Sequence, residues 1–282
     1  MKKKIIVILG QTATGKSNLA VKIAKKISGE IISADSRQVY KGLNIGTGKI
    51  TKGEMKSVPH HLLDVANPKR KFTVSEYKKL VEEKIKEIIF RDKVPIICGG
   101  TGFYLDAITK GVIFPEVPPN NKLRKTLEKK TALALFKMLI KLDINRAKSI
   151  DKYNKVRLIR AIEIVKALGK VPRITEKIPP YEFVKIGLYL PSNILKKKIE
   201  TRVAGMFQKG LLKEIKKLKK GRVFNKRLKE LGFEYDNPTY EKVVSQTLKY
   251  AKRQMTWFKR DKEIKWFDAS KKINLTKIKR IF

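Results

Sequence analysis

Eight residues near the N-terminus have the types and spacing of a phosphate-binding loop: Gly10-Gln11-Thr12-Ala13-Thr14-Gly15-Lys16-Ser17. The two glycines allow backbone geometry that a Cβ would obstruct, so backbone N–H groups can point at an anion. Lys16 adds a positive charge, and the Ser17 hydroxyl can ligate a Mg²⁺ ion held by the same phosphates. The chemistry predicted here is the binding of a diphosphate or triphosphate.

The segments on either side supply the context that this motif requires. Residues 5–9 form an apolar run that is typical of a buried strand, and residues 18–24 have helical periodicity. A chance match is the alternative, and the order strand, loop, helix argues against it. The fate of the bound phosphate group has to be inferred from other residues.

Two further predicted strands end in polar residues. The run 30–34 leads into Asp35-Ser36-Arg37-Gln38, and the run 94–98 leads into Gly99-Gly100-Thr101-Gly102. The carboxyl ends of parallel strands gather at the ligand crevice of an open sheet, so Asp35 and Thr101 are expected in the site. For Asp35 taken alone, a helix cap or support of a Mg²⁺ site is an equal alternative.

The alternation of strands and helices predicts an α/β fold, a P-loop NTPase-like parallel sheet flanked by helices. No strand pattern appears from about 120 to 176, which predicts an all-helical insertion domain. Thr73 and Glu76 have capping-box spacing at the start of a helix that runs to about Phe90. We expect a catalytic core of residues 1–114 and 181–282, an insertion at 115–180, a helix at 192–220, a loop at 227–235, a helix at about 240–260 and a last strand at 266–268.

The charge of the chain indicates a polyanionic partner. Its 282 residues include 67 Lys and Arg against 26 Asp and Glu, a formal net charge of +41, and 42% are hydrophobic, enough for a core. Nucleic acid fits this imbalance best, although a lysine-rich composition alone contributes to it. An anionic membrane surface is the weaker alternative, because no strongly amphipathic terminal helix supports it.

The remaining chemistry-bearing residues point to structural roles. Cys98 is expected to be a core residue, and a single cysteine permits no disulfide within the chain. His60 and His61 are adjacent, which suits a structural or substrate-lining role better than metal binding. No apolar run could span a bilayer and the first strand begins at once, so we expect a cytoplasmic protein without a signal peptide.

Arg157 and Arg160 lie three residues apart on one predicted helix face, followed by Glu163. A solvated row of ion pairs and a clamp for an anion are both consistent with this spacing. Farther along the chain, basic residues interleave with Tyr250 and Trp257, a pattern that suits a nucleic-acid face.

Seven segments, in this order and at these separations, together resemble one family. The chain is similar over nearly its whole length to the tRNA dimethylallyltransferases (tRNA isopentenyltransferases). The segments that carry the resemblance are Gly10-Gln11-Thr12-Ala13-Thr14-Gly15-Lys16-Ser17, Ser33-Ala34-Asp35-Ser36-Arg37-Gln38-Val39-Tyr40-Lys41-Gly42, Ile45-Gly46-Thr47, His60-His61-Leu62-Leu63-Asp64, Gly99-Gly100-Thr101-Gly102, Arg157-Leu158-Ile159-Arg160-Ala161-Ile162-Glu163 and Ala251-Lys252-Arg253-Gln254-Met255-Thr256-Trp257-Phe258.

The resemblance implies transfer of the dimethylallyl group of dimethylallyl diphosphate to the exocyclic N6 amine of adenosine 37 in tRNA. It implies that Asp35 and Thr101 are the catalytic residues, with Asp35 as the general base and Thr101 in the channel near the diphosphate and the substrate. It also implies that the loop 10–17 holds the diphosphate with Mg²⁺ on Ser17. It implies a helical insertion that clasps the anticodon stem-loop, in a protein that we expect to be a monomer. The residues it assigns to tRNA are Asp35, Ser36, Arg37, Gln38, Thr101, Arg124, Arg157, Arg160, Lys229, Gly232 and Arg253.

The chain departs from the family pattern at two informative positions. Gln11 stands where the family usually has proline, which alters loop stiffness and leaves phosphate chemistry intact. Glu234 stands where the family usually has a basic residue. The insertion is also short, and the zinc finger of eukaryotic members is absent from this sequence.

Three other functions share part of the pattern. An isopentenyltransferase acting on free adenine nucleotides shares the chemistry but would be less basic. A nucleotide or shikimate-like kinase shares the phosphate loop and the sheet but has no need for the Asp35-Ser36-Arg37-Gln38 block. An RNA-binding GTPase-like switch would need a guanine-reading Asn-Lys-x-Asp motif, which the sequence lacks.

Overall fold

The computed structural model of the chain describes residues 2–173 and 175–274. The chain forms two compact units. One, the core unit, contains the residues up to Gly111 and those from Ile178 onward, and the other, the helical unit, comprises Val112–Lys177. The insertion expected from the sequence spans residues 115–180.

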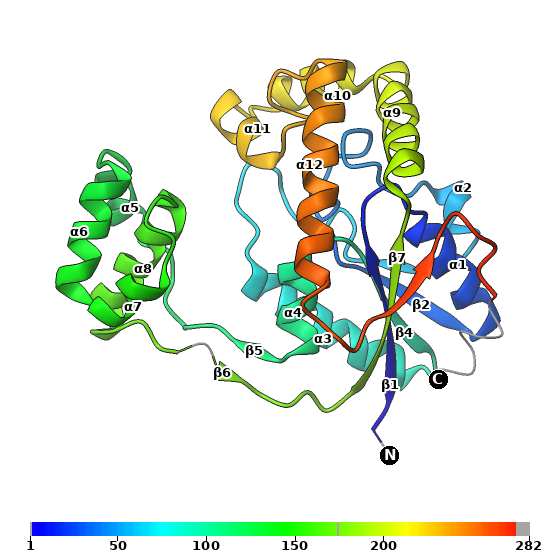
Figure 1. Cartoon of the computed structure of the whole chain (residues 1–282), viewed down its shortest axis with the longest axis horizontal. Coiled ribbons are helices and arrows are strands. Elements are labelled where there is room, and N and C mark those ends of the chain that lie inside the picture. Colours follow the sequence, from blue (N-terminus) through cyan, green and yellow to red (C-terminus); the bar gives the residue numbers. More distant parts are fainter. Residues whose placement is uncertain (1, 174, 275–282) are drawn as a thin grey trace. The chain divides into compact units, whose positions relative to one another are not determined.

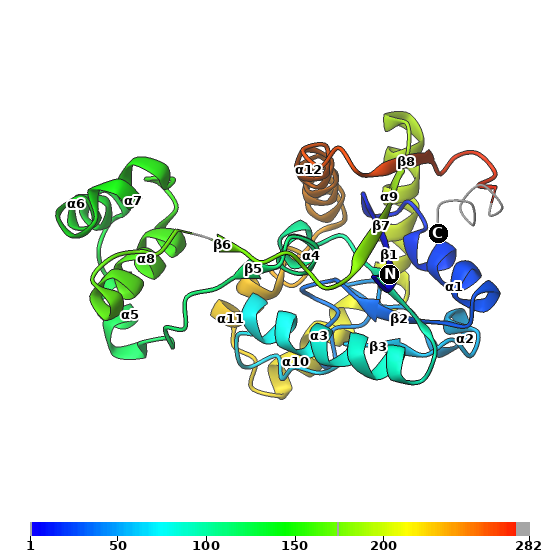
Figure 2. The ribbon, with the colours of Figure 1, turned by 90° about the horizontal axis from the view of Figure 1, so that it is seen from below.

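The core unit is built on a parallel sheet. Within the described residues the sheet has six strands in the order β3-β2-β4-β1-β7-β8, with every neighbouring pair parallel. Figure 1 shows β1 and β7 side by side, and Figure 2 shows β8 next to β7. The strands are β1 Lys4–Gly10, β2 Gly29–Ser33, β3 His60–His61, β4 Val94–Cys98, β7 Glu182–Tyr189 and β8 Lys265–Asp268.

Both faces of this sheet are buried, which explains the continuous apolar runs in its strands. On one face, alternate residues of β1 such as Ile6 and Ile8 pack with the apolar stripe of α1. On the other face, Ile5 and Val7 pack with α3 and α4. The helices of this unit are α1 Lys16–Lys26, α2 Lys52–Met55, α3 Val74–Phe90, α4 Gly102–Thr109, α9 Ser192–Gln208, α10 Leu211–Lys220, α11 Asn225–Leu231 and α12 Tyr240–Phe258.

Helices from the second half of the chain surround the carboxyl end of β1. In Figure 1 this strand runs upward from the N-terminus, and α9, α10 and α12 stand around its upper end. α12 packs against α9, α4 and β1. The ligand crevice of a parallel sheet lies at this end of the strands, and residues of α9 and α12 line the cavity found there.

Several sequence predictions for the core unit are confirmed. Thr73 and Glu76 form the expected capping box, and α3 ends at Phe90. Cys98 is 8% exposed within the core, and burial raises the pKa of its thiol to about 12. His61 Nε2 lies 2.6 Å from Glu30 Oε2, and His60 Nδ1 lies 2.8 Å from the carbonyl oxygen of Val58, so both rings make structural contacts.

Three sequence predictions about elements were wrong. The single helix expected at 192–220 is two helices, because Gly210 adopts a left-handed conformation with φ 96° between α9 and α10. The loop expected at 227–235 is helical in its first part, since α11 runs from Asn225 to Leu231. The segment expected to lack strands ends in the short strand β6, which pairs with β5.

The helical unit has its own small core. Leu135, Leu139, Leu158 and Ile162 meet in its interior and are almost fully buried. Its elements are β5 Val112–Ile113, α5 Asn121–Glu128, α6 Ala132–Leu142, α7 Ile144–Ser149, α8 Lys155–Leu168 and β6 Thr175–Glu176. In the described part of the chain, no helix is long and apolar enough to cross a membrane.

A close approach of two strand ends generates the first prediction. A Cβ added at Gly99 would lie 2.1 Å from the carbonyl oxygen of Ala34, so the backbone would have to shift to make room for it. We expect Gly99→Ala to lower the free energy of unfolding by about 2 kcal/mol, the cost of overpacking a closely packed site. Urea unfolding of the variant and the wild-type protein measures this change.

Gly205 supplies the control, because a Cβ there meets no atom within 4 Å and the residue lies inside α9. Alanine is favoured over glycine inside a helix by roughly 1 kcal/mol, so Gly205→Ala should stabilise the protein. Equal unfolding midpoints for the two variants would contradict the prediction.

Candidate active site

The phosphate-binding loop lies between the end of β1 and the first residue of α1. Gly10 and Gly15 both have positive φ, 131° and 82°, and a Cβ at Gly10 would lie 2.1 Å from the carbonyl oxygen of Leu188. The Thr14 hydroxyl donates to the carbonyl of Gln11 over 2.7 Å and closes the loop on itself. The loop therefore has the backbone geometry predicted for an anion cradle at a helix N-terminus.

A glutamine from α12 holds this loop against the end of β4. Gln254 accepts a hydrogen bond from the backbone N–H of Thr12 at 2.8 Å and donates to the carbonyl of Gly100 at 2.9 Å. Its side chain is buried, at 5% exposure. The sequence pattern gave no indication of this role, because the partners lie more than 150 residues from Gln254.

Lys16 is the charged residue of the loop. Its ammonium group donates to the carbonyl oxygen of Gln11 over 2.5 Å. Removal of the ammonium from water lowers the pKa of Lys16 to about 8, and Arg202 lowers this pKa further while Cys98 and Asp35 act in the opposite direction. A bound anion would therefore stabilise the charged form of Lys16.

Asp35 and Thr101 lie at the carboxyl ends of neighbouring strands, as predicted. Asp35 Oδ1 accepts hydrogen bonds from the backbone N–H groups of Arg37 at 2.8 Å and Gln38 at 3.2 Å. Thr101 Oγ1 accepts from the backbone N–H of Ser36 at 3.0 Å. The Asp35 carboxylate and the Thr101 hydroxyl are thus each fixed by the backbone of one turn, at residues 35–38.

The core unit contains a cavity of about 660 Å³ lined by these groups. The cavity joins the phosphate-binding loop to the ends of β2 and β4. Gly10, Gln11 and Thr14 lie outside its lining. The predicted residues that line it are Thr12, Ala13, Gly15, Lys16, Ser17, Asp35, Ser36, Arg37, Gln38, Thr101, Lys229, Gly232 and Arg253.

Two charged residues of the cavity were not predicted as site residues. Arg202, from α9, donates to the carbonyl oxygen of Thr47 at 3.0 Å, and burial lowers its pKa. Glu234 follows α11, and burial raises the pKa of its carboxyl to about 7, although the nearby Arg37 and Arg202 oppose this. The Asp35 carboxylate raises the pKa of both Arg202 and Glu234. The cavity therefore holds cations and carboxyl groups close to one another.

Two aromatic residues of α12 also face this cavity. Tyr250 and Trp257 line it together with Gln254. A Cβ on Gly102 would lie 2.4 Å from the Trp257 ring, so the indole packs directly on the start of α4. Tyr250 and Trp257, the two aromatic residues of the pattern that predicted a nucleic-acid face, thus line the cavity.

Two of the predicted arginines in the helical unit bind a buried glutamate. Arg124 binds the Glu163 carboxylate through two nitrogens at 2.9 and 2.7 Å, and Arg160 binds it at 2.6 Å. Burial opposes ionisation of Glu163, which is 2% exposed, but the hydrogen bonds from Arg124 and Arg160 hold its pKa below the usual value. Arg157 is exposed on the same helix. None of these three arginines lines the cavity.

The fold is of the P-loop type, and its cavity lies at the carboxyl ends of the central strands. Comparison with known proteins is more specific. The profile of the IPP transferase family matches residues 38–261. The tRNA dimethylallyltransferase of Halothermothrix orenii is 38% identical over 94% of this chain and 88% of its own, and that of Bacillus subtilis is 36% identical over 100% and 96%.

Solved structures that are similar in fold include enzymes of the same kind. The tRNA isopentenylpyrophosphate transferase of Bacillus halodurans superposes with a TM-score of 0.73 at 32% identity, covering 100% of this chain and 95% of that one. A eukaryotic dimethylallyltransferase acting on tRNA superposes with a TM-score of 0.79 at 27% identity, covering 95% and 74%. The chain belongs to the tRNA dimethylallyltransferase (IPP transferase) family, and it is therefore a transferase.

The arginines of α8 provide a prediction about stability. We expect Arg160→Ala to lower the free energy of unfolding of the helical unit by about 2 kcal/mol, because it removes a charge-assisted hydrogen bond from a buried carboxylate. Thermal or urea unfolding followed by circular dichroism measures the loss.

Arg157→Ala is the matched control, since Arg157 lies one turn away on the same helix and is exposed. Its unfolding should stay within about 0.5 kcal/mol of the wild-type value. A loss of equal size in both variants would mean that the Glu163 ion pair is not what Arg160 supplies.

Proposed function

We propose that the chain transfers the dimethylallyl group of dimethylallyl diphosphate to the N6 amine of adenosine 37 in tRNA. The observation that supports this most directly is the single cavity that joins the phosphate-binding loop to Asp35 and Thr101. A donor diphosphate and an acceptor amine need these two kinds of group side by side. Family membership makes a prenyl diphosphate the donor in this proposal.

The diphosphate binds at the phosphate loop. Lys16, the loop N–H groups and the N-terminus of α1 surround its oxygens, and Arg202 adds a second enclosed cation. As the bond between the allylic carbon and the bridging oxygen breaks, negative charge develops on the departing diphosphate. These preoriented donors stabilise that charge.

The residues present fit a Mg²⁺ ion that binds together with diphosphate. Ser17 lines the cavity at the start of α1. No group of three or more His, Cys, Asp or Glu side chains in the described part of the chain could hold a metal by itself. Ser17, diphosphate oxygens and water would therefore be its ligands, and the ion would supply further charge neutralisation of the diphosphate.

The acceptor amine meets the donor beside Asp35. The N6 lone pair forms a bond to C1 of the dimethylallyl group, the C1–O bond breaks, and its electron pair leaves with the diphosphate. The amine loses its proton to the Asp35 carboxylate, which acts as general base. Thr101 and Ser36 orient the reacting groups, and contacts to the nucleoside and its neighbours come from Arg37, Gln38, Lys229, Gly232 and Arg253.

The tRNA is held electrostatically as well as by the site. The net charge of +41 favours association with its phosphates, and adenosine 37 must leave its stack to enter a cavity. The helical unit binds the anticodon stem-loop in this proposal. Within it Arg157 is available for a phosphate contact, whereas Arg124 and Arg160 are engaged by Glu163.

Transfer of labelled dimethylallyl diphosphate to different acceptors tests the proposal. We expect label on unmodified tRNA and none on tRNA in which position 37 is not adenosine. Asp35→Asn should lower kcat by about 10²-fold or more, the contribution of a general base, with tRNA affinity within twofold of wild type.

Other results of this experiment reject the proposal. Label on AMP would assign the chain to enzymes acting on free nucleotides. Phosphate transfer or hydrolysis with ATP in place of prenyl transfer would assign the loop to a kinase or a switch. Near-normal turnover of the Asp35→Asn variant would remove Asp35 from the role of base.

The lowered pKa of Lys16 predicts the pH dependence of donor binding. Below a pKa of about 8 Lys16 is protonated and attracts diphosphate, and above it the neutral amine loses this attraction. We expect kcat/KM for dimethylallyl diphosphate to fall as the pH rises above about 8. kcat should stay level to higher pH, because bound diphosphate keeps the lysine protonated.

Lys16→Arg is the matched variant, since a guanidinium group stays protonated throughout this range. Its kcat/KM should be lower at pH 7 but level from pH 7 to 10. The same decline in both proteins would show that a group other than Lys16 titrates.

A further inference from the structure

We propose that Glu214 is a positioning residue for the diphosphate end of the cavity, acting through residues 43–48 on Arg202. This segment, the Thr47 loop, contributes Gly46, Thr47 and Gly48 to the cavity lining. The inference rests on the proposed binding of diphosphate at Lys16 and Arg202. Glu214 itself does not line the cavity, so it is not assigned contact with substrate.

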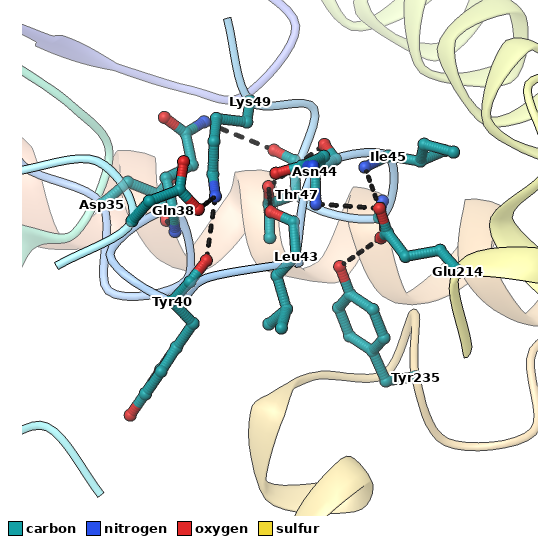
Figure 3. Close-up of polar contacts among 12 residues, drawn as sticks. Asp35, Gln38, Tyr40, Leu43, Asn44, Ile45, Thr47, Lys49, Glu214 and Tyr235 are labelled. Carbon is teal, nitrogen blue, oxygen red and sulfur yellow. Dashed lines mark hydrogen bonds and ion pairs between the residues drawn. The ribbon is translucent and has the colours of Figure 1, made fainter. Parts of the chain in front are cut away.

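The Glu214 carboxylate accepts four hydrogen bonds (Figure 3). Its Oε2 atom accepts from the backbone N–H groups of Asn44 at 2.9 Å and Ile45 at 2.8 Å. Its Oε1 atom accepts from the backbone N–H of Gly46 at 3.1 Å and from the Tyr235 hydroxyl at 2.9 Å. Three successive N–H groups that converge on one anion fix the conformation of the loop.

Hydrogen bonds that a charged carboxylate accepts are stronger than those between neutral groups. Their loss would leave the three loop N–H donors unpaired. A neutral amide cannot replace the carboxylate, because one of its two ends is itself a donor. The geometry thus requires the negative charge and both oxygens of Glu214.

The Thr47 loop in turn positions two side chains that line the cavity. The carbonyl oxygen of Thr47 accepts from Arg202 Nη2 at 3.0 Å and from Gln38 Nε2 at 3.4 Å. The Thr47 hydroxyl donates to the Leu43 carbonyl at 2.7 Å, which closes the loop (Figure 3). A Cβ at Gly48 would lie 2.1 Å from Arg202 Nη2, so the guanidinium rests directly on the backbone.

The opposite side of the Thr47 loop packs against Tyr235. A Cβ at Gly46 would lie 2.6 Å from the Tyr235 hydroxyl oxygen, so only glycine leaves room for this contact. Lys49 fixes the loop's far end through the Tyr40 carbonyl at 2.9 Å and Asp64 at 2.6 Å. The loop is therefore held at both ends, and Glu214 holds the part that precedes Thr47.

Arg202 is the cation whose position depends on this loop, whereas Lys16 belongs to the separate loop at residues 10–17. Release of the Thr47 loop should therefore weaken diphosphate binding by withdrawing Arg202. Binding of tRNA should remain, because its proposed contacts extend far beyond this loop. A residue that merely stabilised the fold would have no such preference between the two substrates.

The test measures the binding of inorganic pyrophosphate with Mg²⁺ by calorimetry, together with KM for dimethylallyl diphosphate and for tRNA. The variants are Glu214→Gln, Glu214→Ala and Tyr235→Phe, with Glu200→Ala as the matched control. Glu200 is an acidic residue of α9 whose ion pair with Lys196 is long, at 3.9 Å, and exposed. Lys16→Ala tests the underlying assignment of the cavity.

We expect Glu214→Gln and Glu214→Ala to weaken pyrophosphate binding and raise KM for the donor tenfold or more. KM for tRNA should stay within twofold, and Glu200→Ala should match the wild-type protein. Tyr235→Phe removes one bond of the four and should weaken pyrophosphate binding about fivefold. If Glu214→Ala does not fold, the other two variants supply the result.

A double variant shows whether Glu214 acts through Arg202. In an Arg202→Ala background, Glu214→Gln should cause no further loss of pyrophosphate affinity, because the coupled groups share one effect. Independent, additive losses would overturn the proposal. So would unchanged pyrophosphate affinity in the Glu214 variants, or equal rises of KM for both substrates.

The Lys16→Ala control separates this inference from the proposed function. If the wild-type protein binds pyrophosphate no better than Lys16→Ala, the assignment of the cavity to diphosphate fails. If Lys16→Ala loses binding while the Glu214 variants retain it, only the role of Glu214 fails.

Discussion

The site depends on backbone packed directly against backbone at the carboxyl ends of the central strands. Gly10 at the end of β1 touches the backbone of Leu188 in β7, and Gly99 after β4 touches that of Ala34 after β2. With no side chains between them, four strand ends come together. The phosphate-binding loop, Asp35 and Thr101 therefore share one cavity although they are far apart in the chain. Any spacer at these contacts would separate the anion cradle from the carboxylate.

Carboxylates are scarce in this chain, and three that are buried or half-buried bind cations and N–H groups. Glu163 gathers Arg124 and Arg160 in the helical unit, Glu30 binds His61 and Arg91, and Glu214 gathers three loop N–H groups. Each accepts several hydrogen bonds, which offset the cost of removing its carboxylate from water. Because 67 Lys and Arg stand against only 26 Asp and Glu, these three carboxylates order the structure while the net charge stays at +41.

Local patterns in the sequence predicted most of the fold and the groups of the site that lie in short motifs. The loop at 10–17, Asp35, Thr101 and the capping box at Thr73 all follow from neighbours within a few residues. The break at Gly210 was missed because the lysine-rich helical pattern continues through it. Arg202, Glu214 and Gln254 were missed for another reason, since their partners lie more than 150 residues away in the chain. No local spacing encodes such a contact.

The link between Gln254 and Thr12 has a consequence for synthesis of the protein. These two residues are separated by 242 positions, so the phosphate-binding loop leaves the ribosome long before its partner. At translation rates of about 5 to 20 residues per second, the wait lasts roughly 10 to 50 s. During this time the loop at residues 10–17 of the nascent chain lacks the bond that holds it to the end of β4. The chain thus acquires this bond only when α12 has been made, so an incomplete product that ends before Gln254 would lack it.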